Sequence, residues 1–380
     1  MNAESELAEK GLKIYMISSH PTKGCGVSRY AGSLCRGLSG IPVQVASGRV
    51  SFLRDRKIIG PWLGFLHDIL RNSPQVIHIQ YTPSICGYTL PLFLILVKIL
   101  RPHCKIVLTA HEKSSVYRRK QGAITKSLYF MYELIVFHLI DRILVHTEEH
   151  REEITARFRV PGPKTLVVPF GVDEPHVVSD EDIGRVAERY HLEPGTVILF
   201  LGALRPNKGL EYLLRAFSMI KKRMPDVTLV IAGEAAPGHA EYLLELKRMK
   251  EAAALGEDVR FIGFVEDVDI PALVSISSIV VLPYTGITQS GVLHWEAIPY
   301  GKPVIATDVG GIGETVRKHD LGTVIPPGDG DALAYAILDL LNDEDRMELC
   351  AANAQSLEGI YSWENVASRH AAIYLDLLEP

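Results

Sequence analysis

The sequence predicts an α/β protein that is built from two Rossmann-like parallel sheets. Short β-branched runs alternate with helix-period segments along the whole chain, and about six of these runs fall on each side of residue 170. Several of the runs are apolar on both faces, as parallel strands covered by helices are. Alternation of strands and helices indicates βαβ units and therefore a parallel sheet.

The first half of the chain contains the runs Lys13–Ser18, Val43–Ala46, Val76–Gln80, Lys105–Ala110, Ile143–His146 and Thr165–Val168. A helix behind the first run is expected to begin at Ser28 as its N-cap. Its buried stripe would consist of Val27, Tyr30, Leu34 and Leu38.

The stretch Leu90–Val97 is the most hydrophobic part of the chain. It is too short to span a bilayer, which takes about 20 residues. We expect a buried helix with Pro91 in its first turn. The alternative is a helix that docks on a membrane surface, and composition does not separate the two.

The second half repeats this rhythm in the runs Val197–Gly202, Val227–Ala232, Val259–Ile262, Ile279–Leu282, Pro303–Thr307 and Thr323–Ile325. Residues 169–173, Pro-Phe-Gly-Val-Asp, carry the Pro and Gly expected of a hinge between the halves. A helix is expected after the first run, with the i, i+3, i+4, i+7 stripe Leu210, Leu213, Leu214 and Phe217.

Length and composition agree with two domains of ordinary globular type. A chain of 380 residues is too long for one compact core, and 47% hydrophobic and 22% charged residues are typical of soluble domains. A net charge of −5 argues against nucleic acid as a partner, because such proteins present basic surfaces. Five scattered cysteines without a CxxC pair, and a mixed polar start, favour the cytoplasm.

Ligands of open parallel sheets bind outside the carboxyl ends of the strands. Glycine and polar residues gather after the expected strands at Gly24-Cys25-Gly26, His111-Glu112, Arg205 to Lys208, Gly233-Glu234 and Thr288 to Glu296. If the carboxyl edges of the two sheets faced each other, all five clusters would meet in one cleft.

Arg205 and Lys208 lie in a turn flanked by Gly202 and Gly209, just before an amphipathic segment. A planar guanidinium and a compact ammonium both suit phosphate oxygens, so the turn is a candidate phosphate site. A solvated basic turn is the alternative interpretation.

Ser290, Gly291 and Val292 open a helix that is expected to run through Glu296 to Ile298. The free N–H groups at a helix start favour an anion, and a glycine lets a phosphate approach the backbone. Glu296 could accept hydrogen bonds from ribose hydroxyls. The other interpretation is a surface or salt-bridged glutamate.

Together these residues resemble the retaining GT-B glycosyltransferases of glycosyltransferase family 4. The strongest match runs from Gly291 through Trp295-Glu296-Ala297 to Gly301-Lys302-Pro303, and then Asp308-Val-Gly-Gly311. Other matching segments are Leu108 to Glu112, Val167 to Asp173, Val230 to Glu234, Phe261 to Val265 and Tyr361 to Val366.

The resemblance implies a fold of two Rossmann-like domains facing each other across a cleft. Residues 1–170 would form the acceptor domain, and residues 171–360 the nucleotide-sugar donor domain. Residues 361–380 would form a helix that crosses back onto the first domain.

The resemblance also implies a role for each matching residue. Arg205 and Lys208 would bind the donor diphosphate and stabilise the leaving group, so no metal cofactor is expected, and His111 would lie beside the donor sugar. The remaining donor contacts would come from Gly26, Gly233, Phe264, Val265, Ser290, Gly291, Val292 and Glu296.

One position departs from the family pattern. The family usually carries a glutamate eight residues before the one that matches Glu296, and here that position is Thr288. This glutamate normally contacts the sugar, so its loss leaves sugar recognition open. Gln289 and Ser290 could substitute with neutral hydrogen bonds.

The function implied is transfer of a sugar from a UDP- or GDP-sugar to an acceptor hydroxyl in polysaccharide or glycolipid biosynthesis. Two alternatives stay open: a nucleotide-sugar 2-epimerase, which also uses two Rossmann-like domains, and a non-catalytic GT-B partner protein. The acceptor would be a sugar or a lipid-linked glycan. Basic residues after His111 could bring the N-terminal domain to anionic lipid; they are Lys113, Arg118, Arg119, Lys120 and Lys126.

Overall fold

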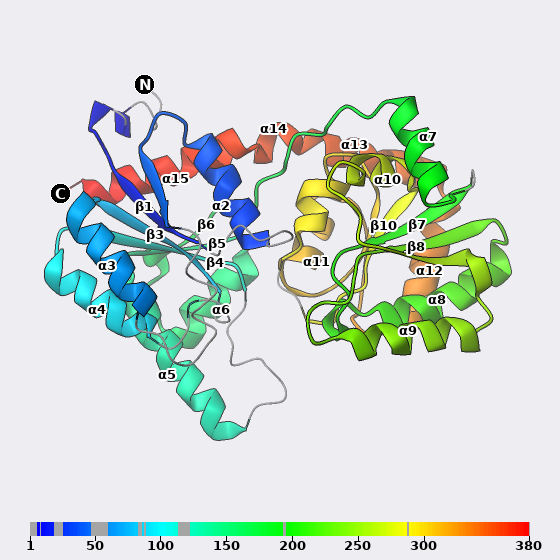
Figure 1. Ribbon diagram of the computed structural model, residues 1–380, viewed down its shortest axis with the longest axis horizontal. Coiled ribbons are helices and arrows are strands. Elements are labelled where there is room, and N and C mark those ends of the chain that lie inside the picture. Colours follow the sequence, from blue (N-terminus) through cyan, green and yellow to red (C-terminus); the bar gives the residue numbers. More distant parts are fainter. Residues whose placement is uncertain are drawn as a thin grey trace. The chain divides into compact units, whose positions relative to one another are not determined.

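The structure of the protein is a computed structural model, shown in Figure 1. It describes residues 6–7, 9–18, 26–46, 60–82, 86, 89–112, 122–192, 195–286 and 289–379. The chain divides into two compact units. Unit 1 comprises Met1–Gly171 and Trp363–Pro380, and unit 2 comprises Val172–Ser362.

Unit 1 contains a six-stranded parallel sheet in the order β2-β1-β3-β4-β5-β6. All six strands expected in the first half are confirmed, with ends that agree or differ by one residue. They are β1 (Ile14–Ile17), β2 (Val43–Ala46), β3 (Val76–Tyr81), β4 (Lys105–Ala110), β5 (Arg142–Val145) and β6 (Thr165–Val167).

Helices pack against both faces of this sheet (Figure 1). They are α2 (Gly26–Gly37), α3 (Gly60–Asn72), α4 (Leu90–Leu100), α5 (Ala123–Leu139), α6 (Glu148–Phe158) and α15 (Trp363–Leu378). The expected N-cap at Ser28 is wrong, because Ser28 lies inside α2. The stripe behind it is confirmed at Tyr30 and Leu34, which are fully buried.

The C-terminal helix α15 belongs to unit 1, as the GT-B resemblance implied. It packs on α2, and Figure 1 shows the two helices side by side. A Cβ atom added at Gly37 would lie only 2.7 Å from Trp363 O and from Ala367 Cβ. A glycine on α2 therefore allows this close helix contact.

Unit 2 contains the second six-stranded parallel sheet, in the order β12-β11-β10-β7-β8-β9. All six strands expected here are confirmed. They are β7 (Thr196–Leu201), β8 (Val227–Ala232), β9 (Val259–Gly263), β10 (Ile279–Leu282), β11 (Val304–Thr307) and β12 (Gly322–Ile325).

The α-helices of unit 2 are α7 (Asp180–Arg189), α8 (Leu210–Arg223), α9 (Ala240–Ala252), α10 (Ile270–Ile276), α11 (Gly310–Lys318), α12 (Gly330–Leu341), α13 (Glu344–Ser356) and α14 (Glu358–Tyr361). The stripe expected on α8 is buried. Asp269, fully buried at the start of α10, accepts from Arg185 at 2.5 Å and Arg189 at 2.6 Å and so ties α7 to this unit.

Helix α4 is only half buried. Pro91 lies in its first turn, as expected, and Leu90, Phe93, Leu94 and Val97 face the core. Its other side exposes Leu92, Ile95, Ile99 and Leu100. Among the described residues, no helix combines the length and the hydrophobicity that crossing a membrane requires.

Candidate functional site

Unit 2 has a topological switch point between β7 and β10. The chain runs from β7 outward to β8 and β9, then returns to the other side of β7 to form β10 to β12. The loops that follow the neighbouring strands β7 and β10 therefore run in opposite directions along the sheet. Ligands of such sheets bind in the crevice between two loops of this kind. Arg205 and Lys208 follow β7, and Ser290 and Glu296 follow β10. Sheet order thus brings these two predicted clusters to one point.

The two loops are fastened to each other by backbone contacts. Thr285 N donates to Asn207 O at 3.0 Å. Gly209 has a φ of +68°, and a Cβ atom there would collide with Pro283 O. Only glycine fits this left-handed position against the neighbouring backbone. The turn that carries both cations is therefore held rigidly against β10.

The amine of Lys208 is buried. Its side chain is 8% exposed, and its Nζ lies 3.6 Å from the centroid of the Tyr284 ring. Within the described residues no carboxylate lies at ion-pair distance from Nζ. Burial, and to a smaller extent the charge of Arg205, hold the pKa of Lys208 well below its ordinary value. A buried lysine whose nearest partner is a ring face would gain a partner for its charge from an incoming anion.

Arg205 lies at the start of the same turn, where Pro206–Lys208 form one turn of 3₁₀-helix. In contrast to Lys208 it is exposed. An exposed guanidinium and a buried ammonium thus stand three residues apart. The pair can provide a bidentate fork and a point charge for one diphosphate.

Tyr284 makes contacts that hold the loop after β10 in place. It is fully buried, and its hydroxyl lies 3.3 Å from the hydroxyl of Ser290. Thr307 Oγ1 donates to Tyr284 O at 2.6 Å from the end of β11. Burial raises the pKa of Tyr284 to about 12, so the ring is neutral at pH 7. The ring links Lys208 to Ser290.

The helix expected after Ser290 is present, but it is a π-helix over Val292–Ala297. Ile298 N donates to Leu293 O at 3.0 Å, which is an i to i+5 bond. A Cβ atom at Gly291 would collide with the Trp295 ring, so packing also requires glycine here. Glu296 is buried, at 7% exposure. Single π-turns are rare and frequently occur at functional sites.

The ends of β8 and β9 carry the other predicted donor contacts. Gly233 N donates to Gly263 O at 2.7 Å, which joins the two strand ends. Val265 is buried, and the Phe264 side chain is 49% exposed. The order β10-β7-β8-β9 places all of these residues along one edge of the sheet, with the cations at its centre.

His111 belongs to unit 1 and follows β4 directly. It is 6% exposed, and both ring nitrogens have a partner: Nε2 lies 2.7 Å from Gln80 Oε1, and Nδ1 lies 3.2 Å from His146 Nε2. Burial lowers the pKa of His111 to about 3, so the ring is neutral at pH 7. The side chain is therefore a fixed neutral group. Gly26, which begins α2, also lies in unit 1.

Two parts of the predicted site fall outside the described residues. These are Gly24 and Cys25 of the glycine loop, and Thr288, the position that departs from the family pattern. Tyr284 and Gln80 contact predicted site residues, but the sequence pattern did not single them out. Tyr284 comes two residues after β10, so its place at a strand end was the available signal.

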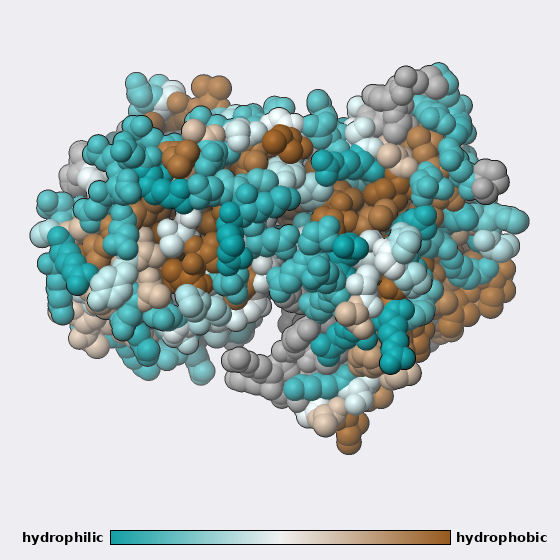
Figure 2. Space-filling view, turned by 180° about the vertical axis from the view of Figure 1, so that it is seen from behind, coloured by the Kyte–Doolittle hydropathy of each residue, from teal (hydrophilic) through white to brown (hydrophobic). Residues whose placement is uncertain are grey.

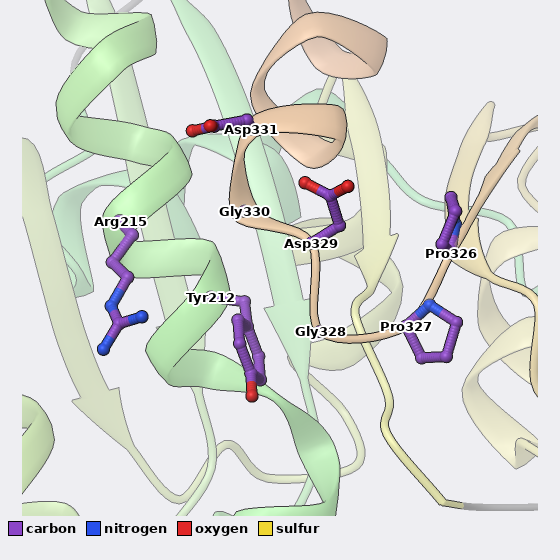
Figure 3. A pocket seen from close by; sticks show the side chains of 8 residues that line it. All are labelled: Tyr212, Arg215, Pro326, Pro327, Gly328, Asp329, Gly330 and Asp331. Atoms are coloured by element: carbon purple, nitrogen blue, oxygen red, sulfur yellow. The ribbon is translucent and has the colours of Figure 1, made fainter.

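A separate hollow of about 460 Å³ lies elsewhere in unit 2 (Figure 3). It opens between the first turns of α8 and the loop from β12 to α12. None of the predicted site residues lines it; its lining consists of Tyr212, Arg215, Pro326, Pro327, Gly328, Asp329, Gly330 and Asp331. The Asp329 carboxylate caps α12 by accepting from Ala332 N at 2.9 Å. The carboxylate is therefore engaged in holding the helix start.

Two family models match the chain, and together they cover most of it. The model described as Glycosyl transferases group 1 matches residues 187–357. The model described as Glycosyltransferase Family 4 matches residues 5–175. The division between the two matches falls close to the division between the two units.

Curated relatives match over part of their length. An alpha-D-kanosaminyltransferase of Streptomyces kanamyceticus is 27% identical over 62% of this chain and 60% of its own. A GDP-mannose-dependent phosphatidylinositol monomannoside mannosyltransferase of Mycolicibacterium smegmatis is 33% identical over 49% of this chain and 50% of its own. The chain thus spans half to three fifths of these relatives.

Solved structures match nearly the whole chain. Anabaena HepE in complex with UDP has a TM-score of 0.75 at 19% identity, covering 96% of this chain and 100% of its own. Sucrose-phosphate synthase from Thermosynechococcus elongatus has the same TM-score and identity, covering 96% and 99%. Similarity at this identity establishes the GT-B fold.

Proposed function

Because the chain belongs to the group 1, family 4 glycosyltransferases, we propose that it transfers a sugar from a nucleoside diphosphate sugar to an acceptor hydroxyl. The observation that carries this proposal is the buried Lys208 beside Arg205 at the switch point of unit 2. Lys208 has no carboxylate partner within the described residues, and a diphosphate would supply the missing negative charge.

In this proposal the two cations drive the reaction electrostatically. Negative charge grows on the diphosphate as its bond to the anomeric carbon breaks, and Arg205 and Lys208 would stabilise that charge. Positioned charges of this kind are usually the largest catalytic contribution. No metal would then be required, and we propose transfer with retention of the anomeric configuration.

The remaining contacts with the donor are proposed from the position of each residue along the carboxyl edge of the sheet. Glu296 would accept from the ribose hydroxyls, and the backbone near Phe264 and Val265 would receive the base. The phosphate and sugar would be met by Gly233, Ser290, Gly291 and Val292, with His111 and Gly26 contributed by unit 1.

UDP or GDP is the proposed leaving group. The relative from Mycolicibacterium smegmatis is named as GDP-mannose-dependent, and Anabaena HepE holds UDP. A lipid-linked acceptor is supported by the same relative, whose name specifies a phosphatidylinositol mannoside.

Thermal unfolding with nucleotides tests the donor site. We expect UDP or GDP, with excess EDTA, to raise the melting temperature by several degrees, while ADP and CMP leave it unchanged. A ligand at about 100 times its dissociation constant adds about 2.7 kcal/mol, enough for such a shift. Absence of a shift with every nucleotide would contradict a preformed donor site. Sugar-nucleotide turnover without any acceptor would indicate an isomerase instead.

We also propose that unit 1 docks on an anionic membrane. Helix α5 exposes a row at i, i+4, i+7 and i+11, and the neighbouring α4 exposes its own apolar side. Figure 2 shows hydrophobic side chains at the protruding tip of α5 and at the edge where α4 lies. The exposed fractions on α5 are Ile124 79%, Leu128 66%, Met131 50% and Ile135 42%.

The basic residues expected to assist docking are Lys126 on α5 and Lys113, Arg118, Arg119 and Lys120, of which the last four lie outside the described residues. An exposed apolar helix face next to basic residues is typical of membrane-surface contact. A lipid-linked acceptor would bring the enzyme to such a surface.

Liposome flotation tests this docking. The protein should float with vesicles that contain anionic lipid, and the double variant Ile124→Asp, Leu128→Asp should not, because two charges would enter the interface. Leu244→Asp, at a 53% exposed position of α9 in unit 2, is the matched control and should still float. Flotation of the double variant at the level of the control would refute the assignment to α5.

A further inference from the structure

A continuous chain of buried polar side chains runs along the carboxyl edge of the sheet in unit 1. From His111, Nδ1 lies 3.2 Å from His146 Nε2, and His146 Nδ1 lies 3.0 Å from Val168 O. On the other side, His111 Nε2 lies 2.7 Å from Gln80 Oε1. The chain crosses β3, β4, β5 and the end of β6, which are neighbours in the sheet.

The chain continues from Gln80 to the C-terminal helix. His78 Nε2 lies 3.4 Å from the Gln80 amide and 2.7 Å from Thr109 Oγ1. His78 Nδ1 lies 2.6 Å from the hydroxyl of Tyr374 on α15. Gln80, His78, Thr109 and Tyr374 are each at most 1% exposed. Helix α15 thus completes a hydrogen-bond chain that starts at the predicted site residue.

For a neutral His146, hydrogen-bond rules assign every proton along this chain. Val168 O can only accept, so His146 carries its proton on Nδ1 and presents a lone pair at Nε2. His111 must then donate from Nδ1, which leaves a lone pair at its own Nε2. The structure places Gln80 Oε1 next to His111 Nε2, and two acceptors cannot bond. The assignment therefore exchanges the oxygen and nitrogen of the Gln80 amide, so that its NH₂ group faces His111.

The remaining bonds agree with this assignment. With its NH₂ toward His111, Gln80 presents its carbonyl oxygen to the side of His78. His78 then donates from Nε2 to Thr109 and accepts at Nδ1 from the Tyr374 hydroxyl. Each of the linking bonds then has one donor and one acceptor.

Aromatic rings close off His111 and His146 from another direction. The Tyr30 ring lies 4.8 Å from the ring of His111 and 5.2 Å from that of His146. Phe170 and Trp363 pack on the same tyrosine at 5.2 and 5.1 Å. The rotation of the His111 ring is therefore restricted by packing as well as by its two hydrogen bonds.

We propose that Gln80 and His146 are positioning residues for His111. They hold its ring in the neutral form protonated at Nδ1, with both nitrogens engaged. Resting on the proposed glycosyl transfer, this means that His111 acts as a rigid neutral contact for the donor and not as an acid or base. A displacement of such a contact by about 1 Å can cost about 10²-fold in rate.

Histidine-selective ¹⁵N NMR and donor kinetics of Gln80→Met test this proposal. In the unmodified protein, the His111 signals should show a protonated Nδ1 and a hydrogen-bonded, unprotonated Nε2. Gln80→Met keeps the packing volume but cannot donate. It should shift the Nε2 signal, lower kcat about 10- to 100-fold and leave the donor KM within about threefold. Gln75→Met, exposed and directly preceding β3, is the control and should change neither.

Two results would overturn the proposal: a His111 ring protonated at Nε2 in the unmodified protein, or a Gln80→Met variant with unchanged kcat and unchanged ¹⁵N signals. The NMR measurement requires no turnover, so it decides the ring assignment even if the protein transfers no sugar. The nucleotide-induced melting shift reports separately on the donor site in unit 2. Failure of the proposed function and failure of this inference are thus distinguishable.

Discussion

Replacement of Lys208 by methionine is expected to lower turnover by about 10²- to 10³-fold, the usual cost of removing one preorganised charge from a transition state. The same variant should lose the nucleotide-induced rise in melting temperature. Steady-state transfer assays and thermal unfolding with UDP or GDP measure both effects.

The free Lys208→Met protein should be at least as stable as the unmodified one. Burial disfavours the ammonium of Lys208, and methionine fills similar space against Tyr284 without that cost. Lys222→Met, at an exposed position of α8, is the matched control and should keep full activity. Near-normal turnover of Lys208→Met and of Arg205→Ala, both correctly folded, would disprove the assignment of the diphosphate site.

Gly233→Ala is expected to destabilise unit 2 by about 3–5 kcal/mol. Gly233 has a φ of +139°, in a region that is essentially restricted to glycine, and an added Cβ atom would collide with Gly202 O. Both residues lie at the ends of the paired strands β7 and β8, so neither backbone can move without breaking the pairing. Thermal unfolding should show a melting temperature lower by about 10 °C.

Gly238→Ala separates the cost of backbone strain at a positive φ from the cost of the collision with a neighbouring backbone. Gly238 also has a positive φ, of +81°, but nothing lies within 4 Å of an added Cβ atom. Its replacement should cost only about 1–2 kcal/mol of backbone strain. Equal destabilisation by the two substitutions would mean that the close approach of β7 and β8 is wrong.

The strands could be predicted from local pattern alone. The twelve strands of the described residues lie where β-branched runs were found. In strands such as β7 and β10 the run is apolar along its length because both faces of the strand are buried. The buried stripe of α8 followed in the same way from its periodicity. The N-cap at Ser28 was wrong because a serine can also lie within a helix.

For the candidate site, the sequence could predict only which residues follow the ends of strands, and not which of them touch. That Arg205 and Lys208 follow β7 was evident from the sequence, but the burial of Lys208 depends on the Tyr284 ring, which comes from β10. The π-helix at Val292–Ala297 was not predicted either, since apolar spacing does not distinguish an i+4 from an i+5 bond.

The sequence by itself determined the fold class and the twelve strands of the described residues, because periodicity and glycine position are properties of local segments. The tertiary structure decided which of those segments became neighbours. The contact of Lys208 with Tyr284 and the chain from His111 to Tyr374 each join residues from different elements. Such contacts depend on strand order and packing, and these arise only when the whole sheet assembles.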